Sequence, residues 1–197
     1  GRFLWGNGDE YVGQWQTGRM HGQGRKTLAS GDVYRGEWQN DQACGYGVKE
    51  FACGDRHEGQ HWCDKRHGHG VYRWSSGGVY TGPWKNGKME GYGIKRMVDG
   101  SVYEGLWKND MAHGLGTKTF EGGDSHTGEY QNDQRHGFGV YSLTNGDKFE
   151  GYWHQGEQEG EGTYYYFSNS DVFKGLWHEG RKHGVGQFTA AHQTFEE

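Results

Sequence analysis

A short pattern of aromatic residues and glycines recurs along the whole chain of 197 residues. The pattern is Tyr-x-Gly-x-Trp, and it is clearest at Tyr11, Gly13 and Trp15. Its copies begin at residues 11, 34, 57, 80, 103, 126, 149 and 173, with one extra residue before the last copy. Chains with a fixed repeat of this length fold by stacking one small unit on the next. The repeat therefore constrains the fold more strongly than any local motif.

Each copy reads as a β-hairpin, because two segments with period-two alternation flank a short polar turn such as Asn40-Asp41. A turn centred just before Gln42 would place Trp38 opposite Gly45. The same register would place Gly36 opposite Gly47 and Tyr34 opposite Lys49. Directly opposed residues share a face of the sheet, so we expect the aromatic rings to lie against bare glycine backbone.

The predicted fold class is all-β, an elongated solenoid of about eight stacked antiparallel hairpins forming a twisted rod. About sixteen strands at a spacing of roughly 4.8 Å give a length on the order of 75 Å. We expect residues 1–197 to form a single array. Gly1 falls where the last glycine of a preceding copy would lie. Residues 1–10 are therefore predicted to be the tail of a truncated repeat, and the chain to be a piece of a longer protein.

The full pattern, Y-x-G-x-W-x-x-G-x-x-H-G-x-G, resembles the MORN repeat (membrane occupation and recognition nexus) over essentially the whole chain. The resemblance implies a solenoid of hairpins without enzymatic activity. Within the family, a chain made almost entirely of MORN repeats resembles the cytoskeletal scaffold proteins of apicomplexan and kinetoplastid parasites, which organise the basal complex and budding machinery. It implies cytoskeletal protein partners, a role in cell division and a place in the cytoplasm, at the cytoskeleton or at the inner face of a membrane.

Composition excludes several other classes of protein. No nucleophile elbow, zinc-protease motif or phosphate-binding loop is present, and the period accounts for the recurring Gly, His and Glu residues. Three cysteines without framework spacing indicate a reducing compartment. The net charge of −5 disfavours nucleic acid as a partner. Residues 1–98 carry 14 Lys/Arg against 10 Asp/Glu, whereas residues 99–197 carry 7 against 16.

One column of the repeat changes from basic to aromatic along the chain. Fifteen residues after each start stand Lys26, Lys49, Tyr72, Lys95, Lys118, Tyr141, Tyr164 and Phe188. In one interpretation the Lys stems cover aromatic rings while their charges reach water. In the other, Lys26, Lys49, Lys95 and Lys118 form a stripe that binds anionic phospholipid at about 1 kcal/mol per Lys. The second interpretation predicts the alternative function, a peripheral membrane or phosphoinositide-binding module.

A solenoid exposes its last strand, which is a template for pairing, so we expect a homodimer through the C-terminal repeats. The predicted interface residues are Tyr141, Tyr164, Tyr166, Phe167, Trp177, Phe188 and Phe195. Pairing these halves brings two strongly negative surfaces together, which salt screens but does not abolish. A third hypothesis is a monomeric adaptor that holds one protein partner in a groove.

The third repeat is rich in cysteine and histidine, the residues that zinc prefers as ligands. The candidate metal ligands are Cys44, Cys53, His57 and Cys63. Register places Cys44 and Cys63 towards one end of the hairpins and Cys53 and His57 towards the other. We therefore expect no required cofactor, with zinc as one alternative, bound within a chain or shared between two chains. In the other alternative, Cys is a small buried apolar residue and His fills a shortened aromatic position.

Overall fold

The computed structural model describes residues 1–191, and its contacts divide the chain into two compact units, Gly1–Val98 and Asp99–Glu197. The strands of the first unit are β1 (Arg2–Leu4), β2 (Glu10–Gln16), β3 (Arg19–Thr27), β4 (Val33–Gln39), β5 (Gln42–Glu50), β6 (Arg56–Trp62), β7 (Lys65–Arg73), β8 (Val79–Lys85), β9 (Lys88–Met89) and β10 (Gly91–Arg96). Those of the second unit are β11 (Val102–Lys108), β12 (Met111–Thr119), β13 (Ser125–Gln131), β14 (Gln134–Ser142), β15 (Lys148–His154), β16 (Glu157–Tyr165), β17 (Val172–His178) and β18 (Arg181–Thr189).

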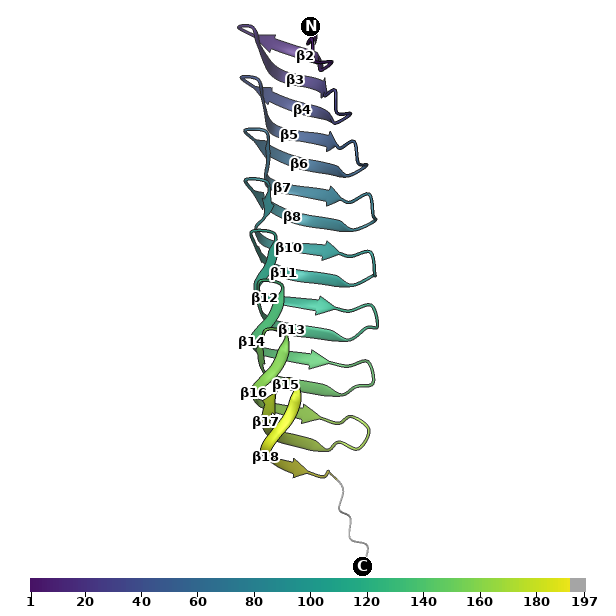
Figure 1. Ribbon diagram of the computed structural model, residues 1–197, viewed down its shortest axis with the longest axis vertical. Helices are drawn as coiled ribbons and strands as arrows, with labels where there is room; N and C mark the ends of the chain where they lie inside the picture. The colour runs from purple at the N-terminus through teal and green to yellow at the C-terminus, as the bar shows by residue number, and fades with distance from the viewer. Residues whose placement is uncertain (192–197) are drawn as a thin grey trace, which may run out of the picture. The chain divides into compact units, whose positions relative to one another are not determined.

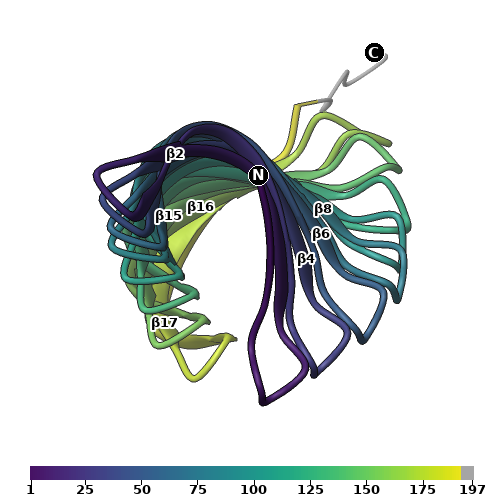
Figure 2. The ribbon, with the colours of Figure 1, turned by 90° about the horizontal axis from the view of Figure 1, so that it is seen from above.

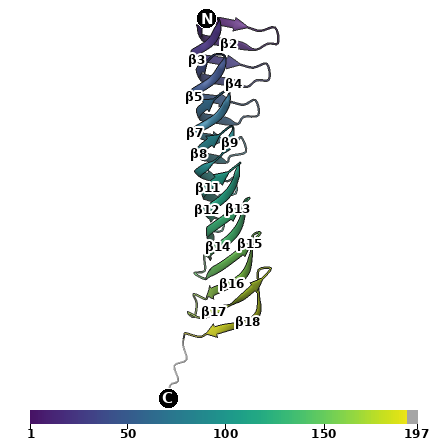
Figure 3. The same cartoon turned by 90° about the vertical axis from the view of Figure 1, so that its left-hand side faces the viewer.

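Each repeat is an antiparallel hairpin that pairs with the hairpin next to it in the same unit. In the first unit β2 pairs with β3, β3 with β4 and β4 with β5, and this order continues along the unit (Figure 1). The second unit repeats the arrangement from β11 to β18 (Figure 3). The predicted all-β stack of MORN-type hairpins is confirmed within each unit. Residues 1–191 contain no helix, and hence no helix long and apolar enough to cross a membrane.

The hairpins are closed by two-residue turns in which both residues have positive φ. Asn40 and Asp41 have φ values of 50° and 70°, and Cys63 and Asp64 have values of 48° and 64°. Positive φ at both central positions defines the type I′ turn, whose twist matches that of the flanking strands. Asn and Asp tolerate this conformation better than other non-glycine residues, which explains why Asn-Asp recurs at the turns.

The predicted register is confirmed at two positions and wrong at the third. Tyr34 lies opposite Lys49 and Gly36 opposite Gly47, but Trp38 lies opposite Ala43. A β-bulge lies between these pairs. The two-residue turn pairs Trp38 with Ala43, whereas the pairing of Gly36 with Gly47 leaves more residues on β5 than on β4 between the two pairs. Gly45 lies within the bulge at a φ of +91°, which a side chain would strain.

The ring at the repeat start, which is tyrosine, histidine or phenylalanine, packs on the glycine pair of each repeat. A methyl group added to Gly47 would overlap the ring of Tyr34, so the ring lies directly on bare backbone. Tyr34 contacts the ring of Trp38 edge to face, with centroids 5.1 Å apart, and Trp38 contacts Tyr11 of the preceding repeat at 5.4 Å. Within each unit the strands are curved (Figure 2). A continuous row of perpendicular rings therefore forms the core within a unit.

Two series of aspartates, which sequence reasoning missed, fasten each hairpin to its neighbour. At the tight turns, Asp41 accepts the backbone N–H of Met20 at 2.8 Å and Asp64 accepts that of Ala43 at 2.8 Å. At the opposite loops, Asp55 accepts the N–H of Ser75 at 2.8 Å. The second unit has the same bonds at Asp133 and Asp124. Hydrogen bonds to a charged acceptor are stronger than neutral ones, so these aspartates stabilise the stacking.

Candidate binding surface on the aromatic face

Lysine side chains lie over aromatic rings on the same face as the tyrosines and tryptophans. The Nζ atom of Lys49 is 4.7 Å from the ring centroid of Phe51. The three other lysines of this column lie over Trp5, Trp74 and Phe120 at 5.1, 4.9 and 5.1 Å. These distances are typical of cation–π contacts. They agree with the interpretation in which the Lys stems cover rings.

Arginine takes over this role in two repeats, at a position that sequence reasoning did not single out. The guanidinium of Arg66 lies 4.2 Å from the Trp84 ring centroid and 4.8 Å from that of Tyr72. It also donates a hydrogen bond of 2.8 Å to the carbonyl oxygen of Gly87 in the next turn. A planar guanidinium can stack and donate at once, which an ammonium cannot do as well.

The same arrangement occurs in the second unit around Arg135. Its guanidinium lies 4.0 Å from the Trp153 ring centroid and 5.4 Å from that of Tyr141, and it donates to the carbonyl oxygen of Gly156 at 2.6 Å. Burial lowers the pKa of Arg135, yet an arginine side chain keeps its charge in proteins. A signal was present in the sequence, since both arginines stand nine residues after a repeat start that is histidine rather than tyrosine.

Where the lysine column becomes tyrosine, the phenol hydroxyl bonds to an aspartate of the loop. Tyr72 donates to Asp55 at 2.5 Å and Tyr141 to Asp124 at 3.0 Å. At the equivalent place in an earlier repeat, Lys49 forms an ion pair of 3.5 Å with Asp32. Burial, followed by the bond to Asp55, raises the pKa of Tyr72 to about 12, while Ser75 N–H and Tyr72 lower the pKa of Asp55. The tyrosines are therefore neutral donors at physiological pH.

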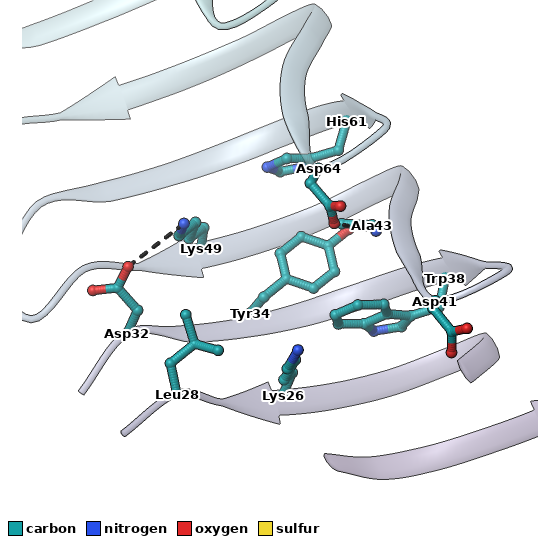
Figure 4. Close-up of a pocket in the computed structure, with 10 residues that line it drawn as sticks. All are labelled: Lys26, Leu28, Asp32, Tyr34, Trp38, Asp41, Ala43, Lys49, His61 and Asp64. Carbon is teal, nitrogen blue, oxygen red and sulfur yellow. Dashed lines mark hydrogen bonds and ion pairs between the residues drawn. The ribbon is translucent and has the colours of Figure 1, made fainter. Parts of the chain in front are cut away.

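A cavity of about 240 Å³ opens on this face in the first unit (Figure 4). Tyr34, Trp38 and His61 supply aromatic walls. Its charged lining comes from Lys26, Lys49, Asp32, Asp41 and Asp64. Rings with charges of both signs suit the side chains of a protein partner better than a purely anionic ligand.

A second cavity, of about 280 Å³, opens on the same face of the second unit. Tyr141, Phe149, Trp153 and Tyr164 are among its lining residues, together with Gln158. Both cavities lie over the ring ladder rather than at the hairpin turns alone. The aromatic face of each unit thus carries a cavity.

The four lysines predicted to bind lipid are engaged within the protein. Each lies over a ring, and Lys49 is also paired with Asp32. Binding of anionic phospholipid by Lys26, Lys49, Lys95 and Lys118 stays a prediction.

The structure does not bring the four predicted metal ligands together. Cys44 is half-buried and its thiol contacts the side chain of Gln39, whereas Cys53 and Cys63 are exposed and Cys63 belongs to a tight turn. His57 is buried between other rings, with centroids 4.8 Å from His61 and 5.5 Å from Trp84. Within residues 1–191, no three His, Cys, Asp or Glu side chains are grouped as a metal site. A zinc ion shared between two chains stays a prediction.

The predicted interface residues divide between the core and the surface of the second unit. Trp177 is buried, and Tyr141 and Tyr164 pack against the cluster that contains it. Tyr166 is half-buried and contacts Lys182, while Phe167 and Phe188 are 71% and 57% exposed. Phe195 lies outside the described residues. Of this set, Phe167 and Phe188 therefore present the largest free ring surfaces.

A family model described as "MORN repeat" matches almost the whole chain, at residues 11–33, 34–56, 57–79, 80–102, 103–125, 126–148, 149–170 and 173–191. The chain belongs to the MORN-repeat family. The MORN repeat is a structural repeat, and it accounts for the ring ladder, the glycine pairs and the turns described above. No match was found among curated proteins.

Solved structures give only distant likenesses to this MORN-repeat chain. The TCP domain of Drosophila melanogaster SAS-4, in complex with a proline-rich motif of Ana2, has 10% identity and a TM-score of 0.46, covering 75% of this chain and 80% of that one. The TCP10 domain of Danio rerio CPAP has 13% identity and a TM-score of 0.34, covering 96% and 99%. TM-scores below 0.5 are not evidence of a shared function.

Proposed function

We propose that this MORN-repeat protein is a non-enzymatic structural scaffold that forms a homodimer and organises cytoskeletal or membrane-associated assemblies of the basal-complex or budding type. Its partners are cytoskeletal proteins, and it acts in the cytoplasm at the cytoskeleton. Support comes from the use of the repeated residues, which form packing units, turns and stacking bonds rather than a catalytic group.

The main support for a dimer is that strand β18 is exposed to solvent. All nine residues of β18 are exposed, with Val185 at 92% and Phe188 at 57%. Strand β18 pairs with β17 in register from Val172–Thr189 to His178–Arg181, and the last strand of a stack offers its outer edge to a further strand. Apolar side chains beside an open edge favour pairing with a second copy.

Light-scattering mass across a concentration series tests this proposal. We expect the mass of a dimer for the unmodified protein and a shift towards monomer for Val185→Lys. Val98→Lys is the matched control, because Val98 is also exposed, at 67%, but lies in the first unit. A monomer at every concentration would overturn the dimer. The series is repeated with zinc and with chelator, since a zinc-dependent dimer would place the joint at Cys44 and Cys63 instead of β18.

The alternative function, a peripheral membrane or phosphoinositide-binding module, is separated from the scaffold by vesicle sedimentation. The scaffold proposal expects no pelleting with vesicles that contain phosphatidylserine and phosphatidylinositol bisphosphate at physiological salt. Pelleting that is lost when Lys26 and Lys95 are both changed to Gln would favour the alternative.

A further inference from the structure

One rule joins two positions of the repeat, namely the residues nine and fifteen places after each start. In seven of the eight repeats one of these two residues is a cation and the other is not. The pairs are Met20 and Lys26, Ala43 and Lys49, Arg66 and Tyr72, Met89 and Lys95, Ala112 and Lys118, Arg135 and Tyr141, and Lys182 and Phe188. The repeat that starts at residue 149 is the exception, because it has Gln158 and Tyr164.

Each of the seven cations lies over aromatic rings of the same face, at distances between 4.0 and 5.1 Å for its nearest ring. The rule therefore has a structural counterpart: in each of these seven repeats one positive charge lies over an aromatic ring of the same repeat or of a neighbouring one. Repeat 149 keeps the rings but supplies no charge at either position.

The empty position is built like the two positions that arginine fills. Tyr72 and Trp84, which enclose Arg66, have centroids 5.9 Å apart at 46° between planes. Tyr141 and Trp153 enclose Arg135 at 6.0 Å and 41°. The corresponding rings beside Gln158 are Tyr164 and Trp177, whose centroids are 6.3 Å apart and whose planes make an angle of 30°. The ring pair is thus retained where the arginine is missing.

The backbone around the empty position is also retained. The N–H of Gly180 donates to the carbonyl oxygen of Gln158 at 3.1 Å, just as Gly87 donates to Arg66 at 2.8 Å and Gly156 to Arg135 at 3.0 Å. Gly87 and Gly156 each accept a hydrogen bond from the arginine through their own carbonyl oxygen. Within residues 1–191, the carbonyl oxygen of Gly180 accepts no hydrogen bond. Gln158, Tyr164 and Gly180 line the cavity of about 280 Å³.

Two cations and one carboxylate lie around the cavity. Lys182 of the next repeat lies closest to Phe173, at 4.4 Å, and only at 5.8 and 5.9 Å from Tyr164 and Trp177. Arg135 and Glu157 also line the cavity. The chain tolerates cations in adjacent repeats elsewhere, as Lys49 and Arg66 show.

We propose that the cavity lined by Gln158, Tyr164 and Gly180 binds an arginine side chain from a basic segment of a partner protein. The bound guanidinium stacks on the Tyr164 ring at the edge of the Tyr164–Trp177 pair and donates to the Gly180 carbonyl oxygen, as Arg66 does with Tyr72 and Gly87 within the chain. Residues 99–197 carry 16 acidic against 7 basic residues, so a basic segment of a partner protein complements the charge of this part of the chain.

Arginine fits this site better than lysine for a geometric reason. The guanidinium is planar and weakly hydrated, so it can lie flat against a ring while its edge donates to a carbonyl. The inference extends beyond the scaffold proposal, because it assigns a ligand to one repeat whether the protein is a monomer or a dimer.

The experiment follows the indole N–H signals of Trp153 and Trp177 by NMR during titration with Nα-acetyl-arginine amide. The two signals are assigned with Trp→Phe variants. We expect saturable shifts in the unmodified protein, and weaker binding of Nα-acetyl-lysine amide by about threefold or more. Gln158→Ala keeps the cavity open and should retain the shifts. Gln158→Arg supplies the missing guanidinium from within and should weaken binding at least about tenfold while raising the melting temperature.

Gln134→Arg is the matched control, because it adds the same charge at an exposed position of β14 in the same unit. It should leave the binding unchanged. The proposal is overturned if the indole signals shift equally in Gln158→Arg and in the unmodified protein, or if they show no saturable shift at all. If Gln158→Arg does not fold, Gln158→Ala tests the site independently. Light-scattering mass separates the two sources of arginine: a dimer that dissociates in Gln158→Arg but not in Gln134→Arg would overturn the partner protein as the source.

Discussion

The repeats around Arg66 and Arg135 are two versions of the same arrangement, one in each unit. Each begins with a buried histidine, His57 or His126, and each has an arginine stacked on a tryptophan, at 4.2 and 4.0 Å. Each arginine also donates to the carbonyl of a turn glycine. The two therefore share their packing and their principal hydrogen bond.

They differ in the residue that faces the buried histidine. In the second unit Tyr130 lies there, and its hydroxyl is 2.9 Å from His126 Nδ1. In the first unit His61 takes its place, and both ring nitrogens of His57 are buried without a hydrogen-bond partner. A buried polar group without a partner costs about 1–3 kcal/mol. The same backbone thus accepts one pair whose side chains share a hydrogen bond and one pair whose side chains share none, because the ring contacts are kept in both.

The largest expected effect concerns what the two regions share. Trp84→Ala and Trp153→Ala each remove a buried ring and the platform of an arginine, so each should lower the free energy of unfolding by about 3–5 kcal/mol. Chemical denaturation measures the loss. Trp62→Ala is the control, because Trp62 is 56% exposed and should cost far less. A loss below about 1 kcal/mol for either buried tryptophan would contradict its place in the core.

The second prediction uses the extra histidine of the first region. Burial lowers the pKa of His57 to about 3 and those of His61 and His126 to about 4, with His61 and Arg66 adding to the shift at His57 and Arg135 adding to it at His126. The unfolded chain, with His pKa values near 6.5, binds more protons below that pH. Stability is therefore complete above about pH 6.5 and falls as the solution is acidified.

Each buried neutral imidazole should contribute a loss of about 2 kcal/mol between pH 7 and pH 5. Two such groups lie in the first region and one in the second, so His61→Tyr should reduce the total loss by about 2 kcal/mol. Denaturation at both pH values, in the presence of chelator, measures this difference. His69→Gln is the control for replacing a histidine at an exposed position. An equal loss in His61→Tyr and the unmodified protein would show that His61 is not held neutral.

The third prediction tests whether the two arginines act alike. Arg66→Met and Arg135→Met keep an unbranched apolar stem but remove the stacked charge and the bond to the turn carbonyl. Each should lower the free energy of unfolding by about 2 kcal/mol. Arg73→Met, at an exposed position, is the control for loss of charge. If only one of the two buried positions responds, the regions are not equivalent and the shared geometry does not determine stability.

The sequence predicted the hairpins, the stacking and the glycine beneath each tyrosine, because period and residue type determine them directly. The sequence prediction was wrong at Trp38. The partner of Trp38 depends on the length of the turn and on the presence of a bulge in β5, and the repeat pattern specifies neither. The period is the same with or without the bulge. The structure shows the bulge in the pairing of β4 with β5 and in the positive φ of Gly45.

The candidate site was less accessible from the sequence. Some repeats have lysine fifteen residues after the start, as at Lys49, and others have arginine nine residues after it, as at Arg66. This exchange is visible only when the two positions are compared across all repeats. For the metal candidates, the register read from the sequence already separated Cys44 and Cys63 from Cys53 and His57, and the structure adds that Cys63 belongs to an exposed turn and His57 to the ring ladder. Cysteine and histidine residues that are close in sequence form a metal site only if the strand register places their side chains next to one another on the same face of the sheet.

The smallest effect comes from exchanging the residues that distinguish the two regions. His61→Tyr should place a hydroxyl near His57 Nδ1 and recreate the bond found between Tyr130 and His126, which raises the free energy of unfolding at pH 7 by about 1 kcal/mol. Tyr130→Phe removes that bond and should lower it by a similar amount, since His126 Nδ1 then lies buried without a partner. Tyr103→Phe is a matched control, because its hydroxyl bonds to the backbone carbonyl of Leu106 rather than to a histidine. The measurement is the ¹⁵N chemical shift of the His57 and His126 ring nitrogens. This shift responds to a hydrogen bond with the tyrosine hydroxyl and not to the size of the neighbouring ring. If the His57 signals of His61→Tyr do not move towards those of His126 in the unmodified protein, the difference between the regions lies in their packing and not in this hydrogen bond.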